Sequence, residues 1–425
     1  MNEDFLHFVW KFQKFSTIQL YTAQNEPLQI LEVGQHNFDA GPDFFFGKVV
    51  IGGQVWAGTI EIHLQSSNWY THKHEIDKRY DSVILHVVWE HDMEVRRSDE
   101  TIIPTIEIKH CVDRQVLQNY RKLFSSKQLW INCENEFGKV DEFVVKNWLD
   151  RLYLERLEDK SKLILDQLAN CNNDWEAVLF QLLCKNFGLK VNGDAFLSMA
   201  MSIDYKVVKK SKQKLSILEA LLMGQAGLLS QLKLDTYHEA LVKSYAHTQL
   251  KFGLANSGVI QPKFFRLRPP NFPTVRLSQL ANLLHQRPHL FSELISIQSL
   301  AEYYTLFDVS ASAYWDTHYN FEVVSAKRKK RLTKSFIDLL LINTVIPLKH
   351  CHAIRQGKDI SEEIILLANS ISPEENSIVR KYKMLANLGS SALESQALLQ
   401  LKNSYCEKNK CLQCSIGNNL LKQEA

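Results

Sequence analysis

The sequence has little net charge, no long uninterrupted apolar run, and neither a low-complexity tract nor a repeat of fixed period. A formal net charge of +3 is too small for a protein that coats polyanions, although local basic patches are compatible with it. The longest apolar stretch, residues 336–348, contains Asp338 and Asn343 and is too short to cross a bilayer. The first residues are acidic and lack the basic and apolar regions of a signal peptide. We therefore expect a cytoplasmic protein with no membrane partner.

The composition is that of an ordinary globular protein. With 45% hydrophobic and 23% charged residues over 425 positions, the length suggests two or three domains. Eight cysteines in such a chain fit reduced thiols or metal ligands better than disulfides. The sequence makes no prediction of oligomeric state.

The first part of the chain is predicted to be rich in strands. Apolar runs at 44–51 and 54–64 meet at Gly52-Gly53, which accepts the positive φ angles of a tight hairpin turn. Residues 82–89 predict a buried strand of the same sheet. A later strand is predicted at 101–108, at an edge or broken at Pro104. Further elements expected here are a short helix at 3–15 and a strand at 28–33.

The remainder is predicted to be helical. Apolar residues recur at helical spacing in several segments separated by a proline-rich connector at 262–273. The predicted helices are 141–169, 174–187, 217–232, 235–251, 277–285 and 335–346. The expected fold class is therefore α+β, with a mixed sheet domain at 1–135 and a mainly helical domain at 136–425.

The predicted hairpin carries two carboxylates and a histidine. Asp43 begins the first arm, and Glu61 and His63 lie late in the second arm, on one side because strand side chains alternate. Carboxylates that converge in this way bind a hard divalent cation in phosphodiesterases. The alternative is that Asp43 caps a turn and the other two side chains lie on a solvated sheet face.

This arrangement resembles the PD-(D/E)xK nuclease superfamily, whose core places an Asp and an Asp/Glu-x-Lys on adjacent strands. His63 stands where that pattern has lysine, and Lys48 or Lys73 are candidates to replace the lysine in space. The resemblance implies a restriction-endonuclease-like fold for the N-terminal domain. It also implies Mg²⁺ or Mn²⁺ bound by Asp43 and Glu61, with His63 as a ligand or base.

A second candidate site consists of histidines. His72-x-His74 on an extended segment would put two imidazoles on one side, and with His63 and Asp77 they would suit zinc or iron. The alternative is a surface loop with two solvated histidines. His86 lies inside an apolar strand and is expected to be a core histidine with satisfied hydrogen bonds.

A third candidate site is a group of cysteines near the end of the chain. Cys406, Cys411 and Cys414 have a spacing that binds tetrahedral zinc or an iron–sulfur cluster, and both need four ligands. Cys351, flanked by two histidines, is the best candidate for the fourth ligand by sequence. The remaining cysteines are expected to be buried or incidental: Cys111, Cys133, Cys171 and Cys184.

Basic residues gather in the second half of the chain. Residues 327–331 have the sequence KRKKR, and the proline-rich connector mixes arginines with phenylalanines. Cations neutralise phosphates and aromatic rings stack on bases, so these segments suit nucleic acid; a solvated helix face is the alternative. The predicted contacts are Lys327, Arg328, Lys329, Lys330, Arg331, Arg266 and Arg268.

Four motifs together resemble the signature of an uncharacterised bacterial family catalogued as a domain of unknown function. They are NFDAGPDF at 37–44, WAGTIEIH at 56–63, Asn68-Trp69 followed by His72 and His74, and YDSVILHVV at 80–88. Segments of the helical half and the closing CLQCSIG extend the resemblance over nearly the whole chain. It names no activity, but implies a site that includes Asn37, Asp39, Asp43, Glu61, His63, His72, His74 and Asp77.

The sequence thus supports three hypotheses. The first is a metal-dependent phosphodiesterase or nuclease-related protein that acts on nucleic acid. The second is a zinc- or iron-dependent hydrolase of a small substrate that uses the N-terminal histidines. The third is a non-catalytic protein that binds nucleic acid or a protein partner.

Overall fold

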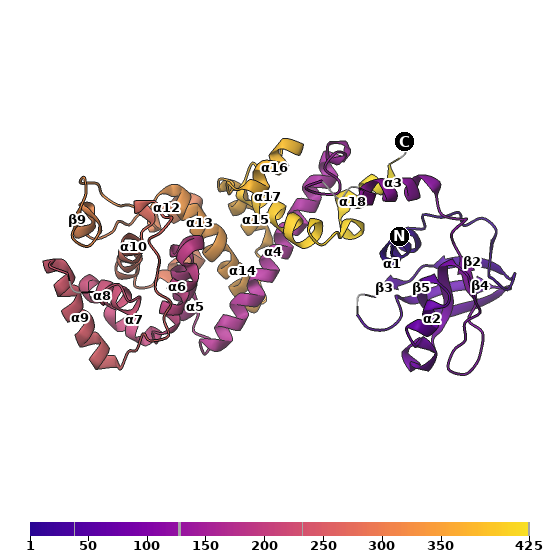
Figure 1. Cartoon of the computed structure of the whole chain (residues 1–425), viewed down its shortest axis with the longest axis horizontal. Helices are drawn as coiled ribbons and strands as arrows, with labels where there is room; N and C mark the ends of the chain where they lie inside the picture. Colours follow the sequence, from indigo (N-terminus) through magenta and orange to yellow (C-terminus); the bar gives the residue numbers. More distant parts are fainter. Residues whose placement is uncertain (38, 126–128, 232, 424–425) are drawn as a thin grey trace. The chain divides into compact units, whose positions relative to one another are not determined.

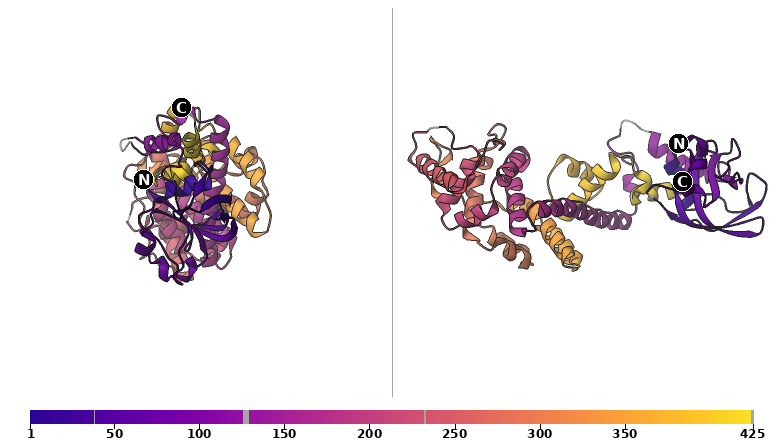
Figure 2. Two further views of the ribbon diagram at one scale, coloured as in Figure 1. Left: turned by 90° about the vertical axis from the view of Figure 1, so that its right-hand side faces the viewer. Right: turned by 90° about the horizontal axis from the view of Figure 1, so that it is seen from below.

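The computed structural model describes residues 1–37, 39–125, 129–231 and 233–423 (Figure 1). The chain forms two compact units: unit 1 is Met1–Trp148 with Lys402–Ala425, and unit 2 is Leu149–Leu401. The predicted domain boundary at 135/136 puts the last residues in the helical part. The structure instead returns them to unit 1, because helix α18 (Ser415–Lys422) packs against helix α3 (Arg114–Ser125) (Figures 1 and 2).

The prediction of an α+β fold is confirmed, with a mixed sheet in unit 1 and a mainly helical unit 2. The seven-stranded sheet has the order β1-β2-β4-β5-β6-β7, and β3 pairs beside β4. Strands β4 and β5 are antiparallel, whereas β5, β6 and β7 run parallel. The strands are β1 (Leu20–Tyr21), β2 (Pro27–Glu32), β3 (Gln35–His36), β4 (Phe44–Ile51), β5 (Gln54–Gln65), β6 (Val83–Glu90) and β7 (Thr105–Glu107).

Two local features of the sheet follow from the sequence. The hairpin turn between β4 and β5 is confirmed at Gly52 and Gly53, whose φ angles are +58° and +86°. Strand β7 lies at the end of the strand order and starts only after Pro104, whose carbonyl accepts a hydrogen bond from the His86 N–H at 2.9 Å. Proline therefore shortens this edge strand, as predicted.

The connection from β5 to β6 is anchored by an aromatic residue. It consists of α2 (Asn68–Thr71), η1 (His74–Ile76) and η2 (Lys78–Tyr80). The Trp69 side chain is fully buried in a cluster with Tyr80 and Val83, and its Nε1 donates to the Arg96 carbonyl at 3.0 Å. Helix α1 (Glu3–Lys11) packs against β5. These contacts hold the segment that carries His72 and His74.

Unit 2 is helical, with one small two-stranded sheet. Most predicted helices are present; the one predicted at 217–232 ends at Gln225, and residue 232 lies outside the described residues. Pro273, expected in the extended connector, is instead the first residue of a helix, where proline's missing N–H costs nothing. The main elements are α4 (Glu142–Asn170), which starts in unit 1, α5 (Trp175–Phe187), α6 (Leu189–Met201), α7 (Tyr205–Ser211), α8 (Leu215–Gln225), α9 (Thr236–Phe252), α10 (Pro273–Gln286), α11 (Leu290–Ser296), α12 (Leu300–Leu306), β8 (His318–Asn320), β9 (Val323–Val324), α13 (Lys334–Leu340), α14 (Ile346–Arg355), α15 (Ser361–Ser370), α16 (Ser377–Leu385) and α17 (Ala392–Gln400).

One helical run in the described part of the chain, Lys334–Arg355, is long and apolar enough by composition to cross a membrane. It joins α13 to α14 through a π-helical turn at Leu341–Val345. Of its most apolar window, 78% is buried inside the protein. This burial is typical of a core helix of a folded domain.

Candidate metal centre

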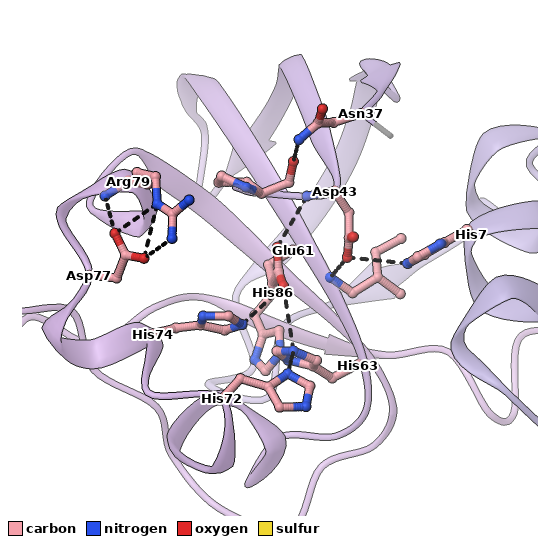
Figure 3. Close-up of polar contacts among 12 residues, drawn as sticks. His7, Asn37, Asp43, Glu61, His63, His72, His74, Asp77, Arg79 and His86 are labelled. Carbon is pink, nitrogen blue, oxygen red and sulfur yellow. Dashed lines mark hydrogen bonds and ion pairs between the residues drawn. The ribbon is translucent and has the colours of Figure 1, made fainter. Parts of the chain in front are cut away.

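The β4–β5 hairpin brings Asp43 and Glu61 together, as the sequence predicts (Figure 3). The backbone N–H of Asp43 donates to Oε2 of Glu61 at 3.1 Å. In return, the backbone N–H of Ile62 donates to Oδ2 of Asp43 at 2.9 Å. These two hydrogen bonds cross-link the start of β4 to β5. The carboxylates therefore belong to a connected polar network and not to a solvated sheet face.

Two histidines lie against Glu61, and a third lies against one of them. Nε2 of His63 lies 3.1 Å from Nδ1 of His72 and 3.4 Å from Oε1 of Glu61. The same Glu61 oxygen lies 3.3 Å from Nε2 of His74. Ligand atoms of a tetrahedral zinc site stand about 3.3 Å apart, given bonds of about 2.0–2.1 Å. Among the residues described, His63, His72 and His74 are the one group whose ligand atoms all lie within 4.8 Å of one another.

The turn that delivers His72 and His74 is not the extended segment predicted from their spacing. His72 ends α2, His74 starts η1, and Lys73 between them has a left-handed φ of 62°. The His74 ring stacks on Tyr80 at 3.7 Å between centroids. The extended prediction is wrong because the buried Trp69 folds this segment into short helices. Both imidazoles nevertheless face His63 (Figure 3).

His86 orients the central histidine. Its Nε2 lies 2.8 Å from Nδ1 of His63, inside the sheet, where His86 is fully buried. Strand β6 places it there because Glu61 and His86 are paired across the parallel β5–β6 ladder. This contact leaves Nε2 of His63 directed at His72 and Glu61. A metal-binding histidine is usually held in this way through its other ring nitrogen. His86 is a core histidine as predicted, and its Nε2 has a partner, but its Nδ1 has no hydrogen-bond partner among the residues that the structure describes.

The electrostatics of the cluster suit a bound cation. Burial, followed by the charge of Asp43, raises the pKa of Glu61 to about 9. Burial, followed by the neighbouring histidines, lowers the pKa of His63 to about 2. Nε2 of His74 is buried and, apart from its 3.3 Å contact with Glu61, has no hydrogen-bond partner in the described part of the chain. A divalent cation would satisfy a buried carboxylate and neutral imidazoles together, because metal ligands bind in their deprotonated forms.

The sequence analysis missed His7. This residue lies on α1, and its Nε2 is 3.2 Å from Oδ2 of Asp43. Burial lowers the pKa of His7, but the hydrogen bond and charge of Asp43, together with the charges of Asp4 and Glu3, raise it above the usual value. A histidine in an amphipathic helix gave no sign of this role, because α1 reaches the hairpin only in the folded sheet.

Two predicted acidic residues lie outside the cluster. Asp77 caps η2 and forms an ion pair with Arg79, with 2.5 Å between Oδ2 and Nη2 (Figure 3). Asp39 is exposed and contributes its backbone to a loop organised by Asn37. The Asn37 side chain also donates to the Pro42 carbonyl at 3.0 Å. Asn37 therefore shapes the loop before Asp43 and is not placed among the candidate ligands.

The cysteines are arranged differently from the prediction. Cys351 lies in α14 of unit 2, where its Sγ is 3.6 Å from the Ser161 carbonyl. Cys406, Cys411 and Cys414 belong to unit 1, and the cysteine whose thiol interacts with all three is Cys133. Sequence spacing could not identify Cys133, because only folding brings residue 133 to the end of the chain.

The basic residues of unit 2 divide into structural and exposed ones. Lys330 is 5% exposed, and its ammonium donates to the carbonyls of Trp315 and Asp316. Arg331 forms an ion pair with Asp308. The burial of Lys330 argues against the prediction that it binds nucleic acid. The ion pair gives Arg331 a partner within the protein. The side chains that stay exposed are Lys327, Arg328, Lys329, Arg266, Arg268 and the ion-paired Arg331.

Comparison with known proteins gives one match. A family model described as "Protein of unknown function (DUF2851)" matches residues 3–377. No curated protein and no solved structure matches the chain.

Proposed function

The chain belongs to the DUF2851 family, and we propose that this member is a metal-dependent phosphodiesterase that acts on nucleic acid. One observation carries the proposal: the buried Glu61 carboxylate, on the strand paired with the one that Asp43 precedes, stands 3.3–3.4 Å from ring nitrogens of His63 and His74. An Asp at the start of one strand and a Glu-x-His on its neighbour is the pattern by which the sequence resembles PD-(D/E)xK nucleases.

In this proposal, Glu61, His63, His72 and His74 hold a divalent ion. Imidazole ligands favour zinc, iron or a similar transition ion over Mg²⁺, which prefers oxygen. The bound ion would polarise a phosphoryl oxygen and lower the pKa of a bound water. Asp43 supports the set through its contacts with Ile62 and His7.

The surroundings of the site suit a phosphate group. His72 is exposed, whereas His63 and His74 are buried, so the ion would be accessible from one side. Lys73 and Lys78 are exposed on the same connection. Cations beside a metal ion stabilise the charge of a phosphodiester under attack. These lysines favour a substrate with phosphate over an uncharged one.

The test uses the metal-loaded full-length protein with single-stranded and double-stranded oligonucleotides. We expect cleavage with Zn²⁺, Mn²⁺ or Fe²⁺, and a loss of roughly 100-fold or more in Glu61→Gln. Asp77→Asn is the matched control, because it removes a carboxylate from the same connection outside the cluster. Equal rates in wild type and Glu61→Gln would refute the assignment.

A second candidate, a zinc- or iron-dependent hydrolase of a small substrate, is favoured by the three-histidine set itself. It requires the same ion and predicts cleavage of small esters or amides with no cleavage of oligonucleotides. A protein that binds the ion at this site and cleaves neither class would instead support a binding role.

A further inference from the structure

Four cysteines from two distant parts of the sequence lie together in unit 1. Cys133 follows α3. Cys406 ends the π-helical turn η7 (Leu401–Cys406), Cys411 begins the short helix η8 (Cys411–Gln413), and Cys414 immediately precedes α18. Cys133 and Cys414 are buried, with 9% and 6% exposure. Asn132, the residue before Cys133, contacts Sγ of Cys411 at 3.4 Å, which brings Cys133 to the C-terminal cysteines. In agreement, burial and then the three C-terminal thiols raise the pKa of Cys133.

The backbone around these cysteines is shaped to present sulfur atoms. Nδ2 of Asn132 donates to Sγ of Cys411 at 3.4 Å and to Oδ1 of Asn409 at 3.2 Å. Burial raises the pKa of Cys414 to about 12, while the backbone N–H groups of Gly417 and Ile416 beside its sulfur act in the opposite direction. Such donors favour thiolate over thiol and are typical of the surroundings of bound metal–sulfur groups.

Gly417 shows how tightly this turn is closed. A Cβ atom at this position would stand 2.1 Å from the carbonyl oxygen of Cys411. The start of α18 therefore lies directly against the Cys411 turn, and only glycine permits this approach. The Cys-Leu-Gln-Cys-Ser-Ile-Gly motif thus specifies a compact loop that directs Cys411 and Cys414 inward.

The sulfurs are less closely grouped than the ligand atoms of the three histidines. In a tetrahedral zinc site with bonds of about 2.3 Å, sulfur atoms stand about 3.8 Å apart. Within the described ranges, no three of the cysteine sulfurs come within 4.8 Å of one another, whereas the three histidines do. In a cuboidal iron–sulfur cluster each thiolate binds a different iron atom, so the sulfurs stand farther apart.

We propose that Cys133, Cys406, Cys411 and Cys414 bind a four-iron, four-sulfur (4Fe–4S) cluster. The cluster fastens Lys402–Ala425 to the first part of unit 1. Because the whole of unit 2 lies in the sequence between Cys133 and Cys406, the cluster closes a very long loop. Cross-links that close long loops remove the most conformational entropy from the unfolded chain.

The test is metal and acid-labile sulfide analysis of full-length protein purified without air, with visible absorption and Mössbauer spectra. We expect about four irons and four sulfides per chain and a broad charge-transfer band. Stoichiometric zinc with no iron would overturn the proposal. So would protein that contains neither iron nor sulfide after reconstitution with ferrous iron and sulfide.

Variants locate the cluster. Cys133→Ser is expected to lose most of the iron, whereas Cys351→Ser, in unit 2, is expected to retain it. Iron retained in Cys133→Ser and lost in Cys351→Ser would overturn the assignment of the fourth ligand.

A second readout covers the case in which Cys133→Ser fails to fold. In wild-type protein, removal of iron by a chelator is expected to make Lys402–Ala425 several-fold more sensitive to limited proteolysis. Unchanged cleavage there would refute the fastening role.

Gly417→Ala is expected to lower cluster occupancy, with Gly258→Ala, whose Cβ would meet open space, as control.

Discussion

Nδ1 of His63 lies 2.8 Å from Nε2 of His86, so one ring nitrogen of the central histidine is held by a buried partner and the other faces the cluster. The two residues lie on adjacent parallel strands, and Glu61 pairs with His86 in the same ladder. The sheet therefore sets the orientation of the imidazole before any ion is bound. The contribution of His86 to metal affinity can therefore be measured by substitution.

We predict that His86→Leu weakens zinc binding about 10- to 100-fold, because loss of an outer partner loosens the ligand it orients. Chelator competition on purified full-length protein measures the affinity. His110→Ala is the control, because the His110 side chain is 82% exposed. Equal affinities in wild type and His86→Leu would show that His63 is oriented by other contacts.

Metal removal should destabilise the wild-type protein more than Glu61→Gln. A bound ion stabilises the folded state by about 2.7 kcal/mol at 100 times its Kd. Without metal, burial keeps the pKa of Glu61 at about 9, so a neutral glutamine imitates the carboxylic acid present at pH 7. Thermal unfolding with zinc and with chelator should show a large shift in wild type and a small one in Glu61→Gln. Equal shifts would place the stabilising ion elsewhere.

The stability of unit 2 should depend on pH through Lys160. Burial, followed by the charge of Arg156, lowers the pKa of Lys160 to about 7, and its Nζ donates to the Asn343 side chain at 3.2 Å. Between about pH 7 and the unfolded pKa near 10.5, the unfolded chain binds more protons than the folded one. The contribution of Lys160 to the free energy of unfolding therefore rises with pH across this window.

Lys160→Met removes that titration. In urea unfolding at pH 6.5, 8 and 9.5, the stability of wild type relative to the variant should improve at each step. A difference that is constant with pH would show that Lys160 has an ordinary pKa.

Lys330→Met should destabilise unit 2 by about 1–3 kcal/mol, because the carbonyls of Trp315 and Asp316 lose a buried donor. Lys329→Met removes the neighbouring exposed charge and should leave the free energy of unfolding within about 0.5 kcal/mol of wild type. If this segment binds nucleic acid, Lys329→Met should lower the slope of log affinity against log salt concentration by about one, as expected for the loss of one phosphate contact. Equal destabilisation by both substitutions would contradict the structural role of Lys330.

Much of unit 1 follows from local sequence. The Gly52-Gly53 hairpin, the buried β6 and the shortened β7 each depend on neighbouring residues, through turn geometry, apolar runs and proline. The convergence of Asp43 and Glu61 was predictable for the same reason, because a hairpin fixes which residues face each other.

In unit 2, the long α4 and the start of α5 at the Asp174 cap were predictable from periodicity and capping.

By itself, the sequence determined the central strands of the sheet, the longest helices and the pairs of residues that one hairpin or one short turn brings together, whereas shorter helices such as α3 and α18 were not predicted. Tertiary structure alone decided that His7 reaches Asp43, that His86 supports His63, that Lys330 is buried, and that Cys133 joins the C-terminal cysteines. The physical reason is range. Turns and periodic patterns act over a few residues, whereas these four contacts depend on how whole elements pack, and packing is set by the burial of many side chains at once.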